Sequence, residues 1–365
     1  MAKLGDIIEQ IRGVSYKPAD LHDNLNNNSV ILLRANNIQN GKIVIDDVVY
    51  VSKNKVSESQ YLRQGDILVC TSSGSKELVG KAAFVDKDLP MVFGAFCKVV
   101  RPKIECCEYM GHFFQSPYYR NHISAASAGA NINNLRNEHI ADLHIPLPSF
   151  DEQRKIAAVL DKVSHLISKR RQQLNKLDEM VKARFVEMFG EPIYNSKGLP
   201  TEQGINFFKL SNGKFLPESK RFTSGIPAYG GNGVSWYTDD PMIKNNTLVV
   251  GRVGFQSGNV RFVEGPLWIT DNAMYVSDYD TQKYDLLFLC ALMEHINFTR
   301  FQDAGDLKKI TQKPFMNMEY IRPSLHEQHK YVFFVKQTEK MKTTVSHSLE
   351  KLETLKKALM QEYFG

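Results

Sequence analysis

The sequence predicts an α+β protein in which two mixed α/β units are separated by two long helices, and the two helices form an antiparallel coiled coil. Three observations support this prediction: an internal repeat, two long segments without helix breakers, and the same order of strands and helix in both units. The predicted parts are residues 1–150 (first unit), 151–190 (first long helix), 191–325 (second unit) and 326–365 (second long helix).

The internal repeat joins the middle of the chain to its end. A shift of 175 positions, without a gap, aligns residues 152–190 with residues 327–365 and gives eleven identities. The identities include a Glu-Gln pair near the start of each segment and a Phe-Gly pair at the end of each. A repeat at a fixed spacing is typical of a duplicated structural unit, so the whole chain is predicted to carry a pseudo-twofold repeat.

Both repeated segments are predicted to be long helices. No Pro or Gly interrupts 151–189 or 326–364, and apolar residues recur in alternating steps of three and four. That spacing is typical of a coiled-coil seam. The predicted seam consists of Ile156, Leu160, Val163, Ile167, Leu174, Leu177, Val181, Tyr331, Val335, Val345, Leu349, Leu352 and Leu359. The alternative is two separate amphipathic helices, each lying on its own unit.

The two units show the same order of elements: strands, one helix, then a Gly-containing loop that leads to the long helix. In the first unit the expected strands are 30–34, 42–51, 66–70, 81–85 and 91–100, and the expected helix is 107–124. In the second unit the expected strands are 247–254, 258–265 and 267–277, and the expected helix is 284–298. The second unit is therefore predicted to be a diverged copy of the first.

Composition indicates a soluble, cytoplasmic protein. No apolar run is long enough to cross a membrane, and the N-terminus "MAKLGDIIEQIRG" lacks the apolar stretch of a secretory signal. The five cysteines are odd in number and form no Cys-x-x-Cys motif, so we expect reduced thiols. The net charge of +6 suits a nucleic-acid partner without requiring one.

The motifs of common catalytic sites are missing from the sequence. There is no phosphate-binding GxxxxGK[ST], no HExxH, no His/Cys cluster with metal-ligand spacing, and no Asn-Pro-Pro or Asp-Pro-Pro before an aromatic residue. We therefore expect a non-catalytic protein with no metal ion and no cofactor in this chain.

Polar, Gly-rich loops next to strands are the candidate binding features, and they occur in both units. Asn and Gln make two-point hydrogen bonds to adenine, Arg makes them to guanine, and Lys neutralises phosphate. Taken singly, such residues are also the ordinary constituents of loops. The candidate DNA-binding residues are Arg34, Asn36, Asn37, Ser72, Ser73, Lys76, Asn133, Arg136, Tyr229, Asn232, Trp236, Arg252, Gln256, Asn259, Arg261, Lys308 and Lys309.

Together these residues resemble a known family. Two variable units alternate with two similar helices, and the segments "LGDI", "LLRANNIQNGKI", "GDILV" and "IPLPSFDEQRKIAAVLD" are present. The chain resembles the specificity subunit of a type I restriction–modification system over its whole length. The most specific feature is the Pro-x-x-x-Glu-Gln opening of each long helix, at Pro148 and Pro323.

The resemblance implies a function in DNA recognition. Each unit would be a target recognition domain that reads one half of a bipartite double-stranded DNA sequence, and the coiled coil would set the spacing. The helices would also dock two methyltransferase subunits, which use S-adenosylmethionine to methylate adenine, and motor-nuclease subunits would join the complex to cleave unmethylated DNA in host defence.

Two other functions remain open at this point. A tandem scaffold with a coiled-coil arm would explain the helices but not the polar loops in both units. A single-chain nuclease with its own recognition domain would need a catalytic cluster, which the motif search does not find.

Overall fold

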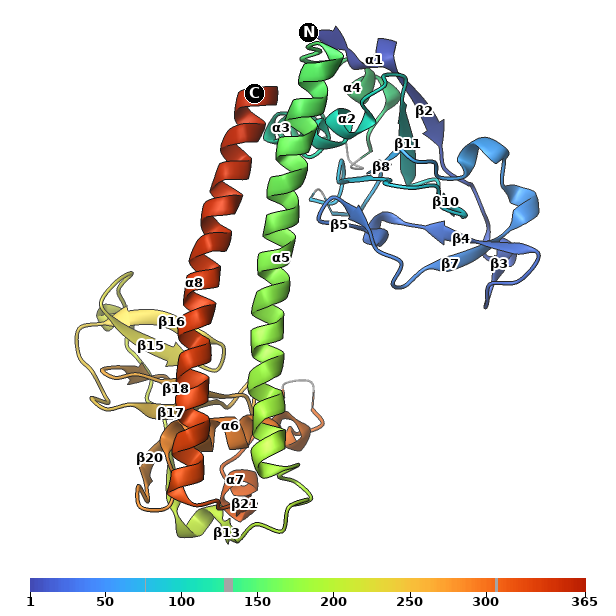
Figure 1. Ribbon diagram of the computed structural model, residues 1–365. Helices are drawn as coiled ribbons and strands as arrows, with labels where there is room; N and C mark the ends of the chain where they lie inside the picture. Colours follow the sequence, from blue (N-terminus) through green and yellow to red (C-terminus); the bar gives the residue numbers. More distant parts are fainter. Residues whose placement is uncertain (76, 128–133, 306–307) are drawn as a thin grey trace. The chain divides into compact units, whose positions relative to one another are not determined.

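The computed structural model describes residues 1–75, 77–127, 134–305 and 308–365, and it has the predicted α+β composition (Figure 1). The chain divides into two compact units: unit 1 contains Met1–Arg171 with His347–Gly365, and unit 2 contains Gln172–Ser346. Each unit therefore includes part of both long helices, whereas the sequence analysis treated the helices as separate parts. Among the described residues, no helix is both long and apolar enough to cross a membrane.

Unit 1 contains two four-stranded sheets. The first is antiparallel and has the order β2 (Ile8–Arg12), β11 (Cys97–Pro102), β8 (Ile67–Cys70), β9 (Ala82–Phe84). The second has the order β10 (Met91–Phe93), β4 (Ser29–Leu33), β7 (Val49–Ser52), β3 (Leu21–His22), with β10 and β4 parallel. Two short pairs complete the unit: β1 (Ala2–Lys3) with β12 (His144–Ile145), and β5 (Ile38–Gln39) with β6 (Lys42–Ile43).

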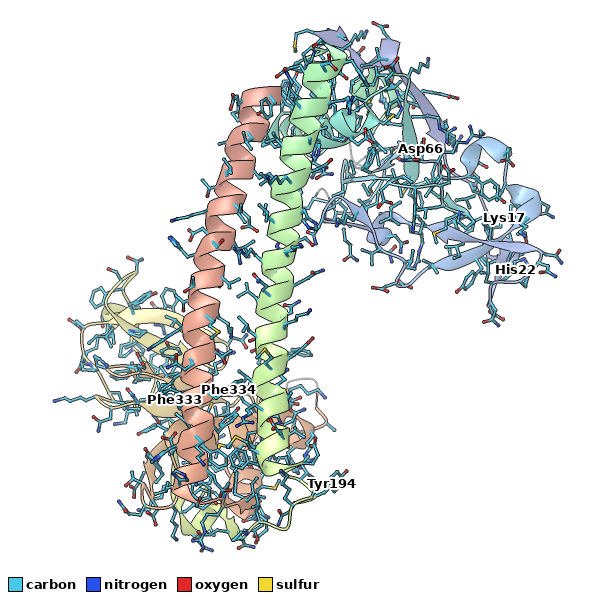
Figure 2. All side chains as sticks on the ribbon, viewed as in Figure 1. Lys17, His22, Asp66, Tyr194, Phe333 and Phe334 are labelled. Atoms are coloured by element: carbon cyan, nitrogen blue, oxygen red, sulfur yellow. The ribbon has the colours of Figure 1, made fainter. Side chains whose placement is uncertain are left out.

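A buried ion pair fixes the start of β8 in unit 1. Asp66 is almost fully buried, and its two carboxylate oxygens accept hydrogen bonds from Arg101 Nε at 2.7 Å and Arg101 Nη2 at 2.8 Å. Figure 2 shows Asp66 well away from Lys17 and His22, which lie toward the β3 end of the second sheet. The two-point geometry orients the strand that leads to the loop with Ser72 and Ser73.

Unit 1 also contains four short helices. They are α1 (Leu4–Ile7), α2 (Cys107–Phe113), α3 (Pro117–Ser127) and α4 (Asn137–Ala141). The single helix predicted over 107–124 is wrong, because Pro117 begins a new helix. A proline disfavours helical backbone in the residue before it, and Ser116 instead accepts a hydrogen bond from Tyr119 N with its hydroxyl.

Two predicted strands of unit 1 are also interrupted. The segment 42–51 divides into β6 and β7, because Asp47 adopts a left-handed backbone with φ of 50°. The segment 91–100 divides into β10 and β11, because a turn forms in which Cys97 N donates to Gly94 O at 2.8 Å.

Unit 2 has the same kind of mixed architecture. Its antiparallel sheet has the order β14 (Phe208–Asn212), β20 (Ala273–Tyr279), β17 (Thr247–Gly251), β18 (Val260–Val263). A second sheet has the order β16 (Gly233–Thr238), β15 (Ile226–Gly230), β19 (Trp268–Ile269), and β13 (Thr201–Gln203) pairs with β21 (Glu319–Ile321). The helices are α6 (Leu286–Ile296) and α7 (Lys313–Asn317), and the Asp285 carboxylate caps α6 by accepting from the backbone N of Leu287 and Phe288.

Short 3-10 turns connect many of these elements. They span Pro18–Asp20, Ala35–Asn37, Lys53–Lys55, Glu58–Gln60, Gly204–Asn206, Glu218–Lys220 and Phe298–Phe301.

The long helices are α5 (Phe150–Phe189) and α8 (Leu325–Phe364), each within one or two residues of its predicted bounds. A buried glutamine fastens the start of each helix. Gln153 Nε2 donates to Pro148 O at 2.9 Å, and Gln328 Nε2 donates to Pro323 O at 2.9 Å. This bond is the structural reason for the repeated Pro-x-x-x-Glu-Gln motif. At the other end of α5, Gly190 adopts φ of 71°, which is the usual way for a helix to end.

The two long helices pack together within each unit and run in opposite directions. In unit 1 the start of α5 lies beside the end of α8 (Figure 1), and one apolar core contains Ile156 and Leu160 of α5 with Met360 and Phe364 of α8. In unit 2 the end of α5 joins the start of α8, and the Phe185 and Tyr331 rings lie 5.5 Å apart. All thirteen predicted seam residues are buried or half-buried.

Aromatic residues anchor both helices to the adjoining units. The Phe364 ring lies 5.1 Å from the Tyr109 ring in unit 1, and the Phe189 ring lies 4.9 Å from the Phe288 ring in unit 2. The predicted seam did not include Phe185, Phe189 or Phe364. These residues contact α2 and α6 rather than only the opposite long helix, so a heptad pattern could not identify them.

Candidate nucleic-acid interface

In unit 2, three separate segments that contain predicted DNA-binding residues meet at one surface. The loop after β17 pairs with the segment at 308–310: Val253 bridges Lys309, and Gly254 N donates to Lys308 O at 2.8 Å. The β15–β16 hairpin turn packs on the same loop, since a Cβ placed on Gly231 would lie only 3.2 Å from Val253 O. Residues far apart in sequence are thereby brought to one place.

Polar side chains on this surface orient one another. Arg261 Nη2 donates to Gln256 Oε1 at 2.7 Å, and Asn259 Nδ2 donates to the same oxygen at 3.3 Å. Gly233, which adopts φ of 119°, leaves room for Arg261, because a Cβ there would lie 3.2 Å from Arg261 Nη1. The exposed Asn232 occupies the same turn. An Arg and two amide side chains with free hydrogen-bonding capacity are suited to base edges and phosphates.

Two of the predicted aromatic residues have different environments. Tyr229 is half-buried and packs against the apolar cluster that includes Val249 and Ile269. Trp236 is exposed, and the Arg221 guanidinium carbon lies 5.4 Å from its ring and 5.4 Å from the Phe215 ring. The sequence analysis did not include Arg221 or Phe215, because their pairing with Trp236 arises only when the chain folds.

In unit 1, Ser72, Ser73 and Arg136 lie near one another. Ser72 bridges Asn134, and Leu135 N donates to Thr71 O at 2.7 Å, so the loop after β8 pairs with the segment before α4. Ser72 and Ser73 are half-buried and Arg136 is exposed. The predicted residues Lys76 and Asn133 lie outside the described residues.

A buried lysine lies beside this part of unit 1. Lys98 on β11 donates from Nζ to Gln10 Oε1 at 2.8 Å and to Asn137 Oδ1. Burial lowers the pKa of Lys98, and the Glu138 carboxylate partly opposes that effect. Lys98 was not among the predicted residues, because within a strand a lysine more often faces solvent.

Arg34 and Asn36 share one partner, the exposed Asp47. Arg34 Nη2 lies 3.0 Å from Asp47 Oδ2, and Asn36 Nδ2 donates to the same oxygen at 2.9 Å. The Asp47 carboxylate therefore orients both the Arg34 and the Asn36 side chains. The prediction for Asn37 is wrong: this residue is 0% exposed, its Nδ2 donates to the carbonyls of Val44 and Asp46, and its Oδ1 accepts from Arg34 N. Asn37 shapes the loop and is not available to DNA.

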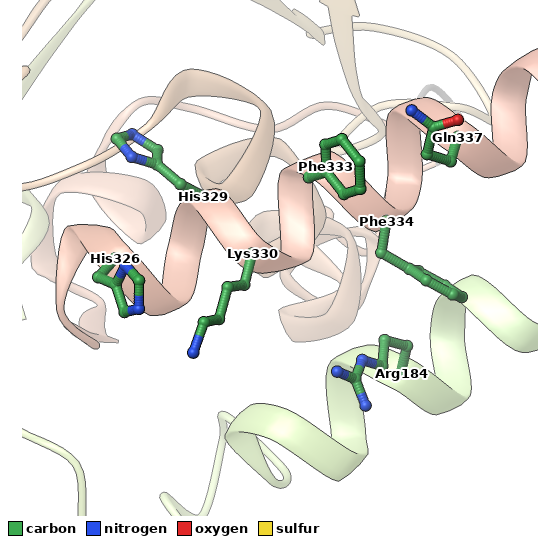
Figure 3. A pocket seen from close by; sticks show the side chains of 7 residues that line it. All are labelled: Arg184, His326, His329, Lys330, Phe333, Phe334 and Gln337. Carbon is green, nitrogen blue, oxygen red and sulfur yellow. The ribbon is translucent and has the colours of Figure 1, made fainter.

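The described residues of unit 2 include the linings of two pockets. One, of about 490 Å³, is lined by α8 residues that include Lys330, Phe333 and Phe334, and by Arg184 of α5, whose guanidinium carbon lies 5.9 Å from the Phe334 ring (Figure 3). The other, of about 330 Å³, lies behind the loop after β17 and is lined by Asn259, Arg261, Glu294 and Asn297 among others.

A titratable group, Glu294, lines the second pocket. Burial raises the pKa of Glu294, although the Lys182 ammonium opposes that shift. Burial lowers the pKa of the adjacent His295, whose ring stacks on Phe185 at 4.0 Å. Within the described part of the chain, no group of three or more His, Cys, Asp or Glu residues is arranged to hold a metal ion.

Comparison with known proteins gives the same family as the motifs. Residues 1–179 match the family model described as the type I restriction modification DNA specificity domain. The chain is 34% identical to the specificity subunit of the type I restriction enzyme EcoKI of Escherichia coli (strain K12) over 272 residues, which are 72% of this chain and 56% of that protein. It is 41% identical to the StySPI specificity subunit of Salmonella potsdam over 182 residues, 50% of this chain and 39% of that protein.

The alignments thus span about half the length of these relatives. A solved structure has the same fold: the crystal structure of a type I restriction–modification S subunit from M. genitalium. It is 14% identical, with a TM-score of 0.64, and the match covers 100% of this chain and 95% of that one.

Proposed function

We propose that this chain, which belongs to the family of type I restriction–modification specificity subunits, reads a bipartite double-stranded DNA sequence on behalf of catalytic partners. Each unit reads one half of the target. The observation that carries this proposal is the surface of unit 2. There the loop with Arg252, Gln256 and Asn259, together with Arg261 of β18, meets the hairpin turn with Asn232 and the segment with Lys308 and Lys309. Mixed cationic and amide side chains on a fixed backbone are suited to a DNA groove.

Corresponding contacts in the two units support two reading domains of common origin. Tyr109 Oη donates to Pro146 O in unit 1, and Tyr284 Oη contacts Ile321 O in unit 2, with 175 positions between the corresponding residues. The bridge between Ser72 and Asn134 has its counterpart in the bridge between Val253 and Lys309. We infer a pseudo-twofold repeat that presents two different loop sets, and therefore two different half-sites.

The length of the long helices sets the distance between the two half-sites. Their apolar residues repeat at heptad spacing, and the predicted seam residues are buried or half-buried in both units. We infer an antiparallel coiled coil whose length sets the unread spacer. Two half-sites on one rigid connection bind jointly, because binding of the first raises the effective concentration of the second.

The chemistry belongs to the partners. We infer that two methyltransferase subunits, which bind S-adenosylmethionine, dock on this chain and methylate adenine, and that motor-nuclease subunits join the same complex. An adenine must leave the base stack to be methylated, so the DNA is expected to be distorted when the complex acts. The chain itself supplies the recognition of the target sequence and no catalytic group.

A map of methylated adenine tests this function. Genomic DNA from cells with and without the gene would be sequenced for N6-methyladenine. The expected result is a two-part motif with an unread spacer, which disappears when the gene is deleted. Identical methylation in both strains, with the partner subunits expressed, would contradict the proposal. A scaffold without a DNA role would also leave DNA unbound at every salt concentration, whereas specific binding is expected to weaken steeply with salt.

A further inference from the structure

The loop between β17 and β18 carries a strongly exposed aromatic side chain. Phe255 is 90% exposed, more than any other large hydrophobic residue identified as exposed in the described chain. Single apolar residues are common on protein surfaces, so exposure alone carries no argument. Phe255 differs from other exposed apolar residues in two ways: its backbone is held by several hydrogen bonds, and its neighbours belong to the proposed DNA surface.

The backbone beneath Phe255 is held from several directions. Gln302 Nε2 donates to Phe255 O at 3.2 Å and to Ser257 O at 2.6 Å. Gly254 N donates to Lys308 O at 2.8 Å, and Gly258 N donates to Gly251 O at 2.8 Å. Gly254 and Gly258 adopt φ of 87° and 92°, which side chains with a Cβ rarely tolerate. The ring is therefore presented on a fixed loop, and little ordering is required when it binds a partner.

The neighbours of Phe255 are the residues of the proposed DNA surface. Arg252 and Gln256 lie on the same loop as Phe255. Arg261 donates a hydrogen bond to the Gln256 side chain, and the backbone carbonyl of Lys308 accepts a hydrogen bond from Gly254 N. Two exposed acids also lie beside this surface: Asp303, whose backbone N donates to Lys309 O at 2.9 Å, and Asp271, whose backbone O accepts from Arg252 Nη1 at 3.4 Å. An aromatic ring surrounded mainly by cationic and amide side chains is suited to duplex DNA. The cations and amides can bind the phosphates, and the ring can contact the stacked bases, which are the apolar interior of the duplex.

We propose that Phe255 is a wedge that enters the base stack of double-stranded DNA at the half-site read by unit 2; this inference rests on DNA recognition by the chain. Arg252, Arg261 and the two lysines would hold the phosphates on either side. Apolar wedges of this kind partly unstack one base step and kink the duplex, and the added contacts offset the unstacking. The wedge would make recognition depend on how easily that step deforms, beyond the bases that are contacted directly.

The test measures unstacking directly. The full chain, co-purified with its methyltransferase partners, would be mixed with a synthetic duplex that carries the motif from the methylation map. 2-Aminopurine, whose fluorescence rises when it is unstacked, would replace each adenine in and beside the unit 2 half-site in turn. We expect a severalfold rise at one step with the wild-type chain. Phe255→Ala should abolish that rise and weaken binding about tenfold, while Phe255→Trp should retain both.

Two control variants separate the wedge from other roles. Tyr194→Ala removes another strongly exposed aromatic ring of unit 2, at 84% exposure on the loop after α5, and should change neither signal (Figure 2). Arg261→Ala should weaken binding and reduce its salt dependence, yet leave the fluorescence rise intact at saturating protein. Both controls and Phe255→Ala should have the thermal stability of the wild type, because the substituted side chains are exposed or half-exposed.

Four results would overturn the proposal. If the wild-type complex binds its motif without unstacking any position, or if Phe255→Ala behaves as the wild type, there is no wedge, although DNA recognition stands. If Phe255→Ala loses its methyltransferase partners on purification, Phe255 contacts protein instead. If the wild-type complex yields no methylated motif and binds no duplex, the proposed function fails, and the wedge fails with it.

Discussion

Gln328 Nε2 donates to Pro323 O at 2.9 Å, and this bond repeats the one between Gln153 and Pro148. Gln328 does more than its counterpart, because Nε2 also donates to Lys283 O at 2.8 Å and Oε1 accepts from Asp285 N at 2.9 Å. One fully buried side chain therefore joins the start of α8 to the start of α6. The repeated Glu-Gln motif thus has a structural role in this chain that is separate from DNA.

Removing this glutamine is expected to destabilise unit 2. Gln328→Ala leaves two backbone carbonyls and one backbone N–H of buried segments without their partner, so we expect a loss of about 2–3 kcal/mol in the free energy of unfolding. Gln153→Ala removes one recorded bond and should cost about 1 kcal/mol. Urea denaturation measures both, with the exposed Gln172→Ala as the control. Equal losses for Gln328→Ala and Gln153→Ala would mean that the link to α6 adds nothing.

Because of Lys356, the free energy of unfolding of unit 1 is expected to be higher at alkaline pH than at neutral pH. It continues the heptad register of α8, and its pKa is lowered from 10.5, first by burial and then by the nearby charge of Arg171, with Asp161 opposing. The unfolded chain therefore binds this proton more tightly than the folded chain. The free-energy cost of burying the charged form of Lys356 is fully present at neutral pH. It decreases as the pH rises through the folded pKa, and it is absent above the ordinary pKa of lysine.

Lys356→Met should then raise the free energy of unfolding at pH 7 by about 1 kcal/mol and flatten its increase above that pH. Urea denaturation from pH 7 to about 10.5 checks both, with the adjacent and exposed Lys357→Met as the control. A loss of stability in Lys356→Met at pH 7 would show that the charged form of Lys356 makes favourable contacts that outweigh its desolvation.

Asp47 is expected to set how Arg34 and Asn36 meet the DNA. Because both side chains bond to Oδ2 of this carboxylate, Asp47→Ala should relax base preference at one or two positions of the half-site read by unit 1. The half-site read by unit 2 should not change. Stability should fall by about 1 kcal/mol, because the exposed ion pair contributes little while Ala is less favourable than Asp at the left-handed φ of 50°.

The methylation map of cells that carry Asp47→Ala checks this prediction. Asp23→Ala, an exposed acid of the same unit, is the control and should leave both half-sites unchanged. Altered reading of both half-sites by Asp47→Ala would contradict the assignment of one half-site to each unit.

The spacer of the target is expected to follow the length of the long helices. Seven residues inserted at matching positions of α5 and α8 keep the heptad register and lengthen each helix by about 10 Å, or roughly three base pairs. The methylated motif should then have a longer spacer and the same two half-sites. An insertion in α5 alone shifts one helix against the other and should abolish methylation. If the double insertion leaves the spacer unchanged, the length of the helices does not set it.

Several features of this protein could be predicted from sequence because they depend on local periodicity. The bounds of α5 and α8 follow from the absence of Pro and Gly and from the heptad spacing, since helical backbone and one-sided burial are properties of a continuous segment. The α+β class and the main strands of both units follow from apolar runs. The break before Pro117 was missed, although a proline inside a helical pattern was a visible signal.

The binding surface, in contrast, was decided by tertiary structure. Asn36 and Asn37 are adjacent and chemically identical, yet one is exposed beside Asp47 and the other is buried as a loop brace. Nothing local distinguishes them, because an amide bonds equally well to a base or to a backbone carbonyl. The approach of the turn at Gly233 to Arg261 accompanies the close packing of Gly231 on Val253, and Gln302 holds the backbone of the loop that presents Phe255. Such contacts join residues far apart in the chain, so they exist only once the sheets of unit 2 have formed. Local periodicity was therefore enough to predict the two long helices, the main strands and the family, while contacts between distant segments set which polar side chains are exposed.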